Sequence, residues 1–319
     1  MTVLNENIRA KTSLNRKDTI WKKIVKQRQL LVLSVPFMIF VLVFNYLPIW
    51  GWIMAFQKFV PGKGIFGSEF VGLANFKEAF TDSNFINAIR NTLLTSILKI
   101  STSFVSAILL ALMLNEVRAR LFKRIVQTIS YLPYFISWVV AVSIVYMVLS
   151  PSSGIVNEIL LALGLIKTPI AFLGEGKYFY GVVALSNVWK NVGWNAIIYL
   201  AAMTGIDPEI YESAIMDGAG RIRRIISVTL PSIMPTIKLM LILNLGNLMN
   251  VGFEQVYLLS NPSNIDASRT IDVYIYTYAL RSGRLSYGTA IGIFNSTVAI
   301  TLINICNYIS KKIDGYGIF

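Results

Sequence analysis

The chain contains no histidine and one cysteine among its 319 residues. This composition excludes histidine-based metal sites, cysteine–histidine catalysis and a framework of intrachain disulfides. Charged residues are also scarce, at 14%, whereas soluble domains carry about 25%. Hydrophobic residues reach 55% and the mean hydropathy is +0.61. These values exclude a disordered chain and a coiled coil and argue against a soluble globular domain. They predict an all-α polytopic membrane protein.

A phosphate-binding P-loop is also missing. Such a loop needs Gly, four residues, and then Gly-Lys-Ser/Thr. The nearest approach is Gly-Glu-Gly-Lys at 174–177, but Ala171 stands where the first glycine is needed and Tyr178 follows the lysine. The chain therefore lacks this signature for hydrolysing ATP itself, and we expect no cofactor in it.

Six segments are apolar enough to cross a bilayer, which takes about 20 helical residues each. The fourth is the weakest, because asparagines and a lysine interrupt it. The segments run over 30–51, 91–114, 125–149, 179–203, 233–260 and 288–309.

The net charge of +13 is better explained by the positive-inside rule than by nucleic-acid binding. With a cytoplasmic N-terminus, the inner segments hold 17 Lys and Arg in 78 residues, against 9 in 95 outer residues. Both termini are therefore predicted in the cytoplasm. The predicted organisation is a cytoplasmic segment at 1–29, a transmembrane domain at 30–309 and a cytoplasmic tail at 310–319. Within 1–29 we expect an amphipathic helix on the inner membrane surface; a frayed basic tail is the alternative.

The cytoplasmic loop at 204–232 predicts a helix–turn–helix elbow. Asp207 is a helix N-cap candidate and Pro208 suits the first helical position. Gly218 is expected to end this helix with a left-handed backbone conformation or a close approach. A second short helix then leads to Pro231 at the membrane. A cytoplasmic partner protein can bind such an elbow.

This loop resembles the EAA loop of bacterial ABC importer permeases, whose motif is Glu-Ala-Ala, three residues, Gly, nine residues, Ile, one residue and Leu-Pro. Ser213 and Val228 depart from the usual Ala and Ile. The resemblance implies a coupling helix that docks into a groove on the ATPase subunit, with Glu212 and Gly218 anchoring the elbow. An ordinary short loop is the alternative. The positions in register are Glu212, Ser213, Ala214, Asp217, Gly218, Ala219, Val228, Leu230 and Pro231.

A second resemblance covers nearly the whole chain. The external segment at 70–76, Phe-Val-Gly-Leu-Ala-Asn-Phe, and Asn-Thr-Leu at 91–93 resemble carbohydrate-uptake permeases. The stretches at 270–274 and 310–312 resemble the polysaccharide-type branch, whose members import oligosaccharides. This resemblance implies a place in the plasma membrane of a bacterial cell and a second, homologous permease in a heterodimer. It also implies two ATPase subunits that bind ATP and Mg²⁺, and an extracellular lipoprotein that binds and delivers the oligosaccharide.

Polar residues inside the predicted fourth and fifth spans are candidates for a substrate path. Amides and aromatic rings offer sugars hydrogen bonds and a flat apolar face. The alternatives are helix–helix hydrogen bonding for each asparagine, and a mutual salt bridge for Lys190 and Glu254. The candidates are Asn187, Lys190, Asn191, Trp194, Asn244, Asn247, Asn250 and Glu254.

Three other functions are alternatives to a sugar-importing ABC permease. A secondary transporter or channel needs an ion-coupling site, and only Lys99, Lys190, Lys238 and Glu254 are charged within the spans. A membrane-embedded enzyme has few chemical options here, because histidine and paired intramembrane carboxylates are missing. An ABC permease for a peptide or an amino acid would share the elbow, although the segment at 70–76 and the many aromatic residues favour sugar.

Overall fold

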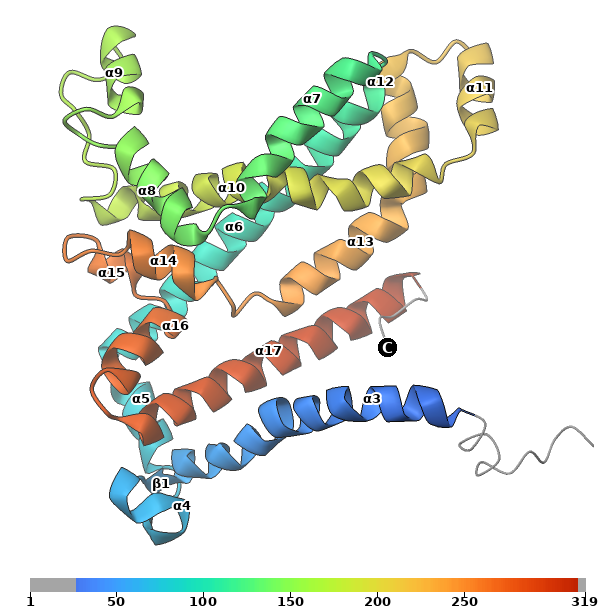
Figure 1. Ribbon diagram of the computed structural model, residues 1–319. Coiled ribbons are helices and arrows are strands. Elements are labelled where there is room, and N and C mark those ends of the chain that lie inside the picture. Colours follow the sequence, from blue (N-terminus) through green and yellow to red (C-terminus); the bar gives the residue numbers. More distant parts are fainter. Residues whose placement is uncertain (1–26, 315–319) are drawn as a thin grey trace, which may run out of the picture.

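The structure, a computed structural model, describes residues 27–314. The predicted interfacial helix and the last five residues of the predicted tail lie outside the described residues. Within them the chain is almost entirely helical (Figure 1), with one two-stranded antiparallel sheet that pairs Gln57 with Phe70. The all-α prediction is therefore confirmed. The elements are α3 (Arg28–Val41), η1 (Leu42–Tyr46), η2 (Leu47–Phe56), β1 (Gln57–Lys58), η3 (Pro61–Lys63), α4 (Gly64–Gly67), β2 (Glu69–Phe70), α5 (Ala74–Thr81), α6 (Ser83–Glu116), α7 (Arg120–Tyr131), η4 (Leu132–Phe135), α8 (Trp138–Val148), α9 (Ile155–Ala162), α10 (Gly176–Thr204), α11 (Pro208–Met216), α12 (Arg221–Arg224), η5 (Ile225–Thr229), α13 (Leu230–Gly246), α14 (Phe253–Leu259), α15 (Ile265–Ser268), α16 (Ile271–Tyr274), η6 (Ile275–Leu280) and α17 (Leu285–Asp314).

Four continuous helices among the described residues are long and apolar enough to cross a membrane. They are Arg28–Phe56, Ser83–Glu116, Arg221–Gly246 and Leu285–Lys312. A fifth candidate is the bent pair formed by Arg120–Phe135 and Trp138–Val148. Helix α10 is 29 residues long but is not among them, because polar residues interrupt its apolar surface. The fold thus shows a polytopic helical architecture without fixing the number of spans at six.

The third predicted span, 125–149, is not one helix. Helix α7 continues into the 3-10 turn η4 at Pro133, and α8 starts at Trp138 with a bend of 107° between the two parts. Pro133 lacks an amide donor and so interrupts the helical hydrogen bonding. Ser137 restarts it, because its side chain accepts a hydrogen bond from the Val140 amide as the N-cap of α8.

The fifth predicted span, 233–260, is wrong at both ends. The helix begins at Arg221 and passes through the π-helical turn η5 into α13 without a break, so Pro231 lies inside a continuous helix. A π-helical turn can accommodate a nearby proline, which has no amide hydrogen to donate. At the other end α13 stops at Gly246, and α14 starts only at Phe253. Gly252, with φ of +89°, takes a left-handed conformation in the connecting turn.

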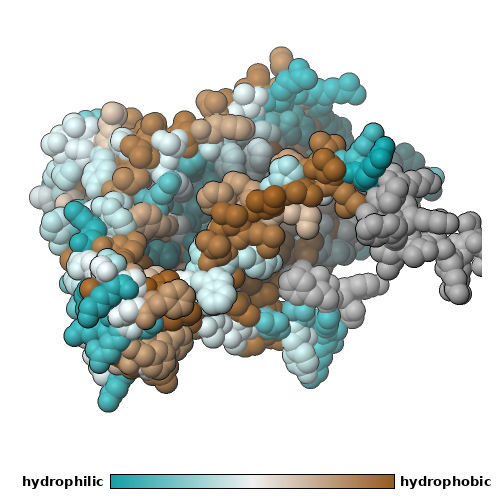
Figure 2. All heavy atoms as spheres, turned by 60° about the horizontal axis from the view of Figure 1, so that its bottom comes forward, coloured by the Kyte–Doolittle hydropathy of each residue, from teal (hydrophilic) through white to brown (hydrophobic). Residues whose placement is uncertain are grey.

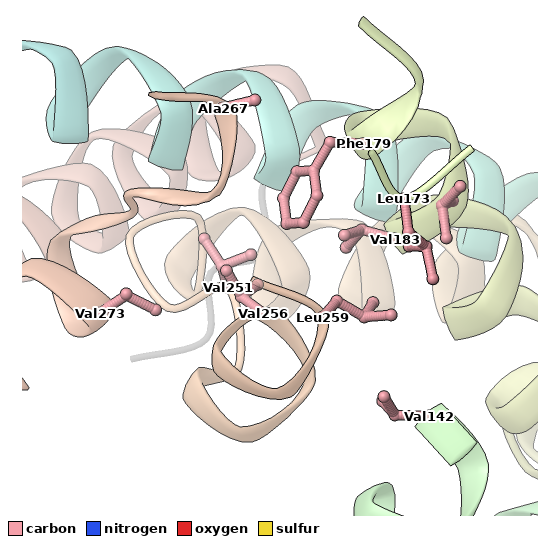
Figure 3. Packing of buried hydrophobic residues seen from close by; sticks show 10 residues of the cluster. Val142, Leu173, Phe179, Val183, Val251, Val256, Leu259, Ala267 and Val273 are labelled. Atoms are coloured by element: carbon pink, nitrogen blue, oxygen red, sulfur yellow. The ribbon is translucent and has the colours of Figure 1, made fainter. Parts of the chain in front are cut away.

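Helices α6 and α10 form the most extensive pair in the molecule. Around this pair lie three buried apolar clusters. In one of them, Phe179 and Val183 of α10 meet Val256 and Leu259 of α14 and Val142 of α8 (Figure 3). This cluster holds α14 and α8 against α10, and therefore fixes both of the unexpected helix breaks beside α10.

Helix α3 has no buried residue. Its side chains are almost all apolar, and Phe37 is 75% exposed. On the face shown in Figure 2, hydrophobic residues form a brown band that runs across the molecule toward the grey residues. An apolar helix surface of this kind has to be covered by lipid or by another transmembrane helix.

Candidate translocation cavity and coupling loop

A polar cavity of about 180 Å³ lies where α6, α10 and the end of α13 meet. Amide, hydroxyl and ammonium groups dominate its lining, and no aspartate or glutamate of the described residues lines it. The lining residues are Ser96, Lys99, Ile100, Ser103, Asn187, Asn191, Asn195, Asn244, Asn247, Asn250 and Val251.

Helices α10 and α6 form two sides of this cavity. Asn187, Asn191 and Asn195 follow one another at intervals of four residues and therefore share one face of α10. Ser103 of α6 accepts a hydrogen bond of 3.2 Å from the Asn195 amide. Asn191 donates to the Asn187 side-chain oxygen over 2.9 Å. Part of the amide capacity is used in packing α6 and α10, and the rest faces the cavity.

The third side is the turn between α13 and α14. Asn247 and Asn250 lie in this turn, outside regular helix. The Lys99 ammonium donates a short hydrogen bond to the Val251 carbonyl oxygen. Non-helical backbone at membrane depth needs such partners or contact with a water-filled cavity. The turn therefore has both a donor and a polar space beside it.

The cavity gathers five of the eight residues predicted for the substrate path: Asn187, Asn191, Asn244, Asn247 and Asn250. Their role in substrate passage stays a prediction. Ser96, Lys99, Ser103 and Asn195 were not among the predicted path residues. Asn195 continues the four-residue spacing of Asn187 and Asn191, which could have identified it, whereas the α6 residues are revealed only by the packing of α6 on α10.

Glu254 is placed elsewhere. The predicted fifth span, 233–260, places it in one continuous helix with Asn247 and Asn250, and residues three or four apart would then share a helical face. The break at 247–252 instead puts it in the first turn of α14, exposed and away from the cavity. The described ion pairs include none between Glu254 and Lys190. A helical-face argument fails here because the helix does not continue.

Lys190 does not line the cavity either. It is 5% exposed, and its ammonium donates to the backbone oxygens of Tyr134 at 2.8 Å and Pro133 at 3.4 Å. It also lies 5.4 Å from the ring centres of Tyr134 and Trp138. These carbonyls belong to η4, where the helical bonding ends. Lys190 therefore satisfies the Tyr134 carbonyl and adds a second donor to the Pro133 carbonyl, which also accepts from the Ile136 amide. The end of a helical turn is a favourable place for a cation.

Trp194, the third predicted path residue outside the cavity, stacks on Tyr134 with ring centres 4.4 Å apart and planes 3° from parallel. The close approach of α10 to α7 that permits this contact depends on Gly193. A Cβ atom on Gly193 would lie 2.1 Å from the Ser130 carbonyl oxygen. Trp194 and Lys190 thus hold the bend of the α7–α8 segment against α10.

The elbow has the predicted local structure. The Asp207 carboxylate accepts a hydrogen bond of 3.0 Å from the Glu209 amide and caps α11, with Pro208 at its start. Gly218 has φ of +75°, and the expectation of a left-handed conformation there is confirmed. The Tyr211 hydroxyl lies 2.9 Å from that of Thr229 in η5 and ties α11 to the following helix.

Several positions of the motif lie at the end of α11, where backbone hydrogen bonds close the helix. The Ala219 amide donates to the Ala214 oxygen at 2.9 Å and the Gly218 amide to the Ile215 oxygen at 3.0 Å. This is the Schellman pattern, in which a left-handed residue after the helix lets two amides close it. The Asp217 amide bonds the Ser213 oxygen at 3.0 Å. Glu212 is exposed, and Leu230 and Pro231 open α13.

The elbow presents apolar side chains outward. Met216 is 87% exposed and Ile222 is 74% exposed. In Figure 1, α11 stands apart from the helices around the cavity, at the end of the molecule where α7 begins and α12 lies. A rigid elbow with exposed apolar tips is suited to docking against a partner protein.

Apolar spanning helices, a polar cavity among them and an exposed elbow define a membrane transport permease. Among the described residues, no group of three His, Cys, Asp or Glu side chains could hold a metal ion. The chain belongs to the family of binding-protein-dependent transport system inner membrane components, whose sequence profile matches residues 103–314. This confirms the resemblance to ABC importer permeases and decides against a secondary transporter or a membrane-embedded enzyme.

Individual relatives are similar over almost the whole chain. The polygalacturonan/rhamnogalacturonan transport system permease protein YteP of Bacillus subtilis is 42% identical over 93% of this chain and 92% of its own length. A crystal structure of a bacterial ABC transporter involved in the import of the acidic polysaccharide alginate matches with a TM-score of 0.85 and 39% identity, over 93% of this chain and 100% of the matched chain. The same transporter type in complex with an alginate pentasaccharide-bound periplasmic protein gives 0.86 and 39%, over 94% and 100%.

Proposed function

We propose that this chain is the permease subunit of an ATP-driven importer and translocates an oligosaccharide. The observation that carries this proposal is the asparagine-rich cavity between α6, α10 and the α13–α14 turn. Amide groups donate and accept hydrogen bonds, as sugar hydroxyls do, and each such bond contributes about 1 kcal/mol. The saccharide cargoes named for the relatives support the same class of substrate.

The proposed topology has six spans, with both termini in the cytoplasm of a bacterial cell. Helix α10 provides the fourth span, because 29 residues are long enough and its polar face is covered by α6 and the cavity. The bent α7–α8 segment provides the third. The asymmetry of Lys and Arg supports this orientation and places the loop at 204–232 on the cytoplasmic side. The boundaries at 1–29, 30–309 and 310–319 follow from it.

The proposed partners are a second, homologous permease in a heterodimer, two ATPase subunits and an extracellular solute-binding lipoprotein. The elbow supports the ATPase contact, because Met216 and Ile222 are exposed on a capped, hydrogen-bonded frame. This frame is formed or oriented by the motif residues Glu212, Ser213, Ala214, Asp217, Gly218, Ala219, Leu230 and Pro231. The exposed apolar surface of α3 supports contact with lipid or with the second permease. ATP and Mg²⁺ belong to the ATPase subunits, and no nucleic acid is involved.

The test is uptake by the assembled transporter in proteoliposomes, with its binding protein on the outside and ATP enclosed. We expect import of a labelled oligosaccharide that requires ATP and stops when ATP hydrolysis is blocked. Competition by unlabelled peptides or amino acids at equal concentration is expected to be weak. Uptake of a peptide or an amino acid in place of the oligosaccharide would support the alternative cargo, and uptake without ATP would overturn the proposal.

A further inference from the structure

The candidate translocation cavity contains one cation and no carboxylate among its described lining residues. Lys99 is the ionisable residue there, and its neighbours are asparagine, serine, isoleucine and valine. Its hydrogen bond to the Val251 carbonyl oxygen uses one of the three donors of an ammonium group. A lysine at membrane depth is costly unless it faces water or meets an opposite charge. The cavity therefore offers an ammonium group whose counter-charge is not supplied by the residues around it.

The position of this ammonium is fixed by the helix break. Val251 presents a free carbonyl because α13 has ended at Gly246. Gly252 follows in a left-handed conformation, and a Cβ atom there would lie 3.4 Å from the Lys99 nitrogen. This is an ordinary van der Waals distance, and Lys99 itself lines the cavity. Lys99 is only partly buried, so it can reach a molecule in the cavity.

Lys190 provides the contrast. Its ammonium is already occupied by two backbone carbonyls and two aromatic rings, and it is not part of the cavity lining. Of the two lysines, Lys99 is therefore the one with free donors in the cavity.

We infer that Lys99 pairs with a carboxylate of the cargo and makes the cavity prefer oligosaccharides of uronic acids over neutral ones. This inference rests on the proposed function. The asparagines and serines can bond hydroxyl groups, which acidic and neutral sugars share, so they do not distinguish the two. A charge-assisted hydrogen bond is roughly twice as strong as a neutral one, and only the acidic sugar can form it with Lys99.

The test compares trigalacturonate with its carboxyl-reduced counterpart, a trisaccharide of the same linkage without charge. ATP-dependent uptake per assembled transporter is measured for both sugars in proteoliposomes with the same binding protein. Selectivity of the binding protein is identical in all variants, so a change in the ratio of the two uptake rates reports the permease. The variants are Lys99→Gln, Lys99→Arg as the charge-retaining control, and Lys312→Gln as a matched loss of an exposed charge in the last turn of α17.

We expect Lys99→Gln to lower uptake of trigalacturonate about tenfold, the order expected for one charge-assisted hydrogen bond, and to change uptake of the neutral sugar less than twofold. Lys99→Arg should keep most of the preference, and Lys312→Gln all of it. An equal fall for both sugars would make Lys99 a structural residue, and an unchanged ratio would give the preference to other groups; either result overturns the inference. If the wild-type transporter imports only the neutral sugar, or neither of the two while it imports another oligosaccharide, the inference alone fails, whereas import of no oligosaccharide would contradict the proposed function itself.

Discussion

The Lys190 ammonium donates a hydrogen bond of 2.8 Å to the backbone oxygen of Tyr134, 56 residues earlier in the chain. This bond joins α10 to the bend between α7 and α8. It explains why a lysine lies 95% buried in an apolar bundle, although no ion pair among residues 27–314 joins it to an acidic side chain. At the end of the η4 turn the Tyr134 carbonyl needs a donor, and Lys190 provides it.

Replacing Lys190 with methionine should therefore destabilise the bundle. Loss of the ammonium leaves the Tyr134 carbonyl without its donor and the Pro133 carbonyl with only the Ile136 amide, which costs about 1–3 kcal/mol. The measurement is the melting temperature of the purified transporter together with uptake per assembled complex. We expect a lower melting temperature and nearly normal uptake per complex. Normal stability with reduced uptake would instead return Lys190 to the substrate path, as the sequence predicted.

Gly218→Val tests the elbow. With φ of +75°, position 218 is strained for any residue with a Cβ atom, and a β-branched residue is the worst case. No atom lies within 4 Å of the Cβ position at Gly218 or at Gly220, so the backbone conformation alone separates the two. Gly220→Val, at φ of −66°, is the matched control.

We expect the Gly218 variant to reach the membrane and to lose copurifying ATPase and coupled transport by at least about fivefold, since a strain of 1–2 kcal/mol has that size. The Gly220 variant should retain both. The docking assignment is wrong if the two variants hydrolyse ATP and transport equally well.

Asn247 and Glu254 are expected to behave differently. Asn247 lines the cavity, and Glu254 lies outside it. Asn247→Ala should lower uptake per assembled complex about fivefold, the effect of one lost hydrogen bond, whereas Glu254→Ala should leave uptake within twofold of normal. A melting curve of each variant separates a substrate contact from helix packing. An equal loss of uptake in both variants would argue that the helix break does not persist during transport.

The hydrogen-bonded carboxyl group of Asp82, at the start of α6, makes the stability of the fold depend on pH. Burial alone would raise the pKa of the Asp82 carboxyl, but hydrogen bonds from the Tyr274 hydroxyl, the Asn84 amide and the Tyr287 hydroxyl hold it below its ordinary value. Because the pKa is lower in the folded state, this stabilisation is complete above about pH 4, the unfolded value, and is lost as the pH falls through the folded value.

Thermal unfolding of the wild type should thus show an added loss of stability below about pH 4, which Asp82→Asn lacks. Tyr274→Phe should cost about 1–2 kcal/mol at pH 7 through lost hydrogen bonds, and less in the Asp82→Asn background. An acid dependence that is the same in Asp82→Asn and the wild type would assign it to other carboxyls.

Reporter fusions test the topology. Fusions in the turns near residues 70, 165 and 283 should give external signals, and a fusion in the elbow after Gly220 a cytoplasmic one. These positions lie between the proposed spans on opposite sides of the membrane. A cytoplasmic signal near 283 would contradict the six-span arrangement, because it would put both ends of α17 on one side.

The sequence by itself determined the membrane class and the elbow. Long apolar segments follow from composition, and most of them appear as long helices. The structure of the elbow at Asp207, Pro208 and Gly218 was predictable because capping and left-handed turns depend on residues within one helical turn.

Only the tertiary structure decided which polar residues meet. Asn187 and Asn247 line one cavity because the helix breaks after Gly246, and no pattern within that segment marked the break strongly enough to predict it. Lys99 and Lys190 look alike in the sequence, as single lysines within predicted spans. Their different roles arise from carbonyl groups supplied by distant helices, Val251 for Lys99 and Tyr134 for Lys190. Local periodicity carries no information about such partners, since contacts far apart in the chain form only when the helices pack.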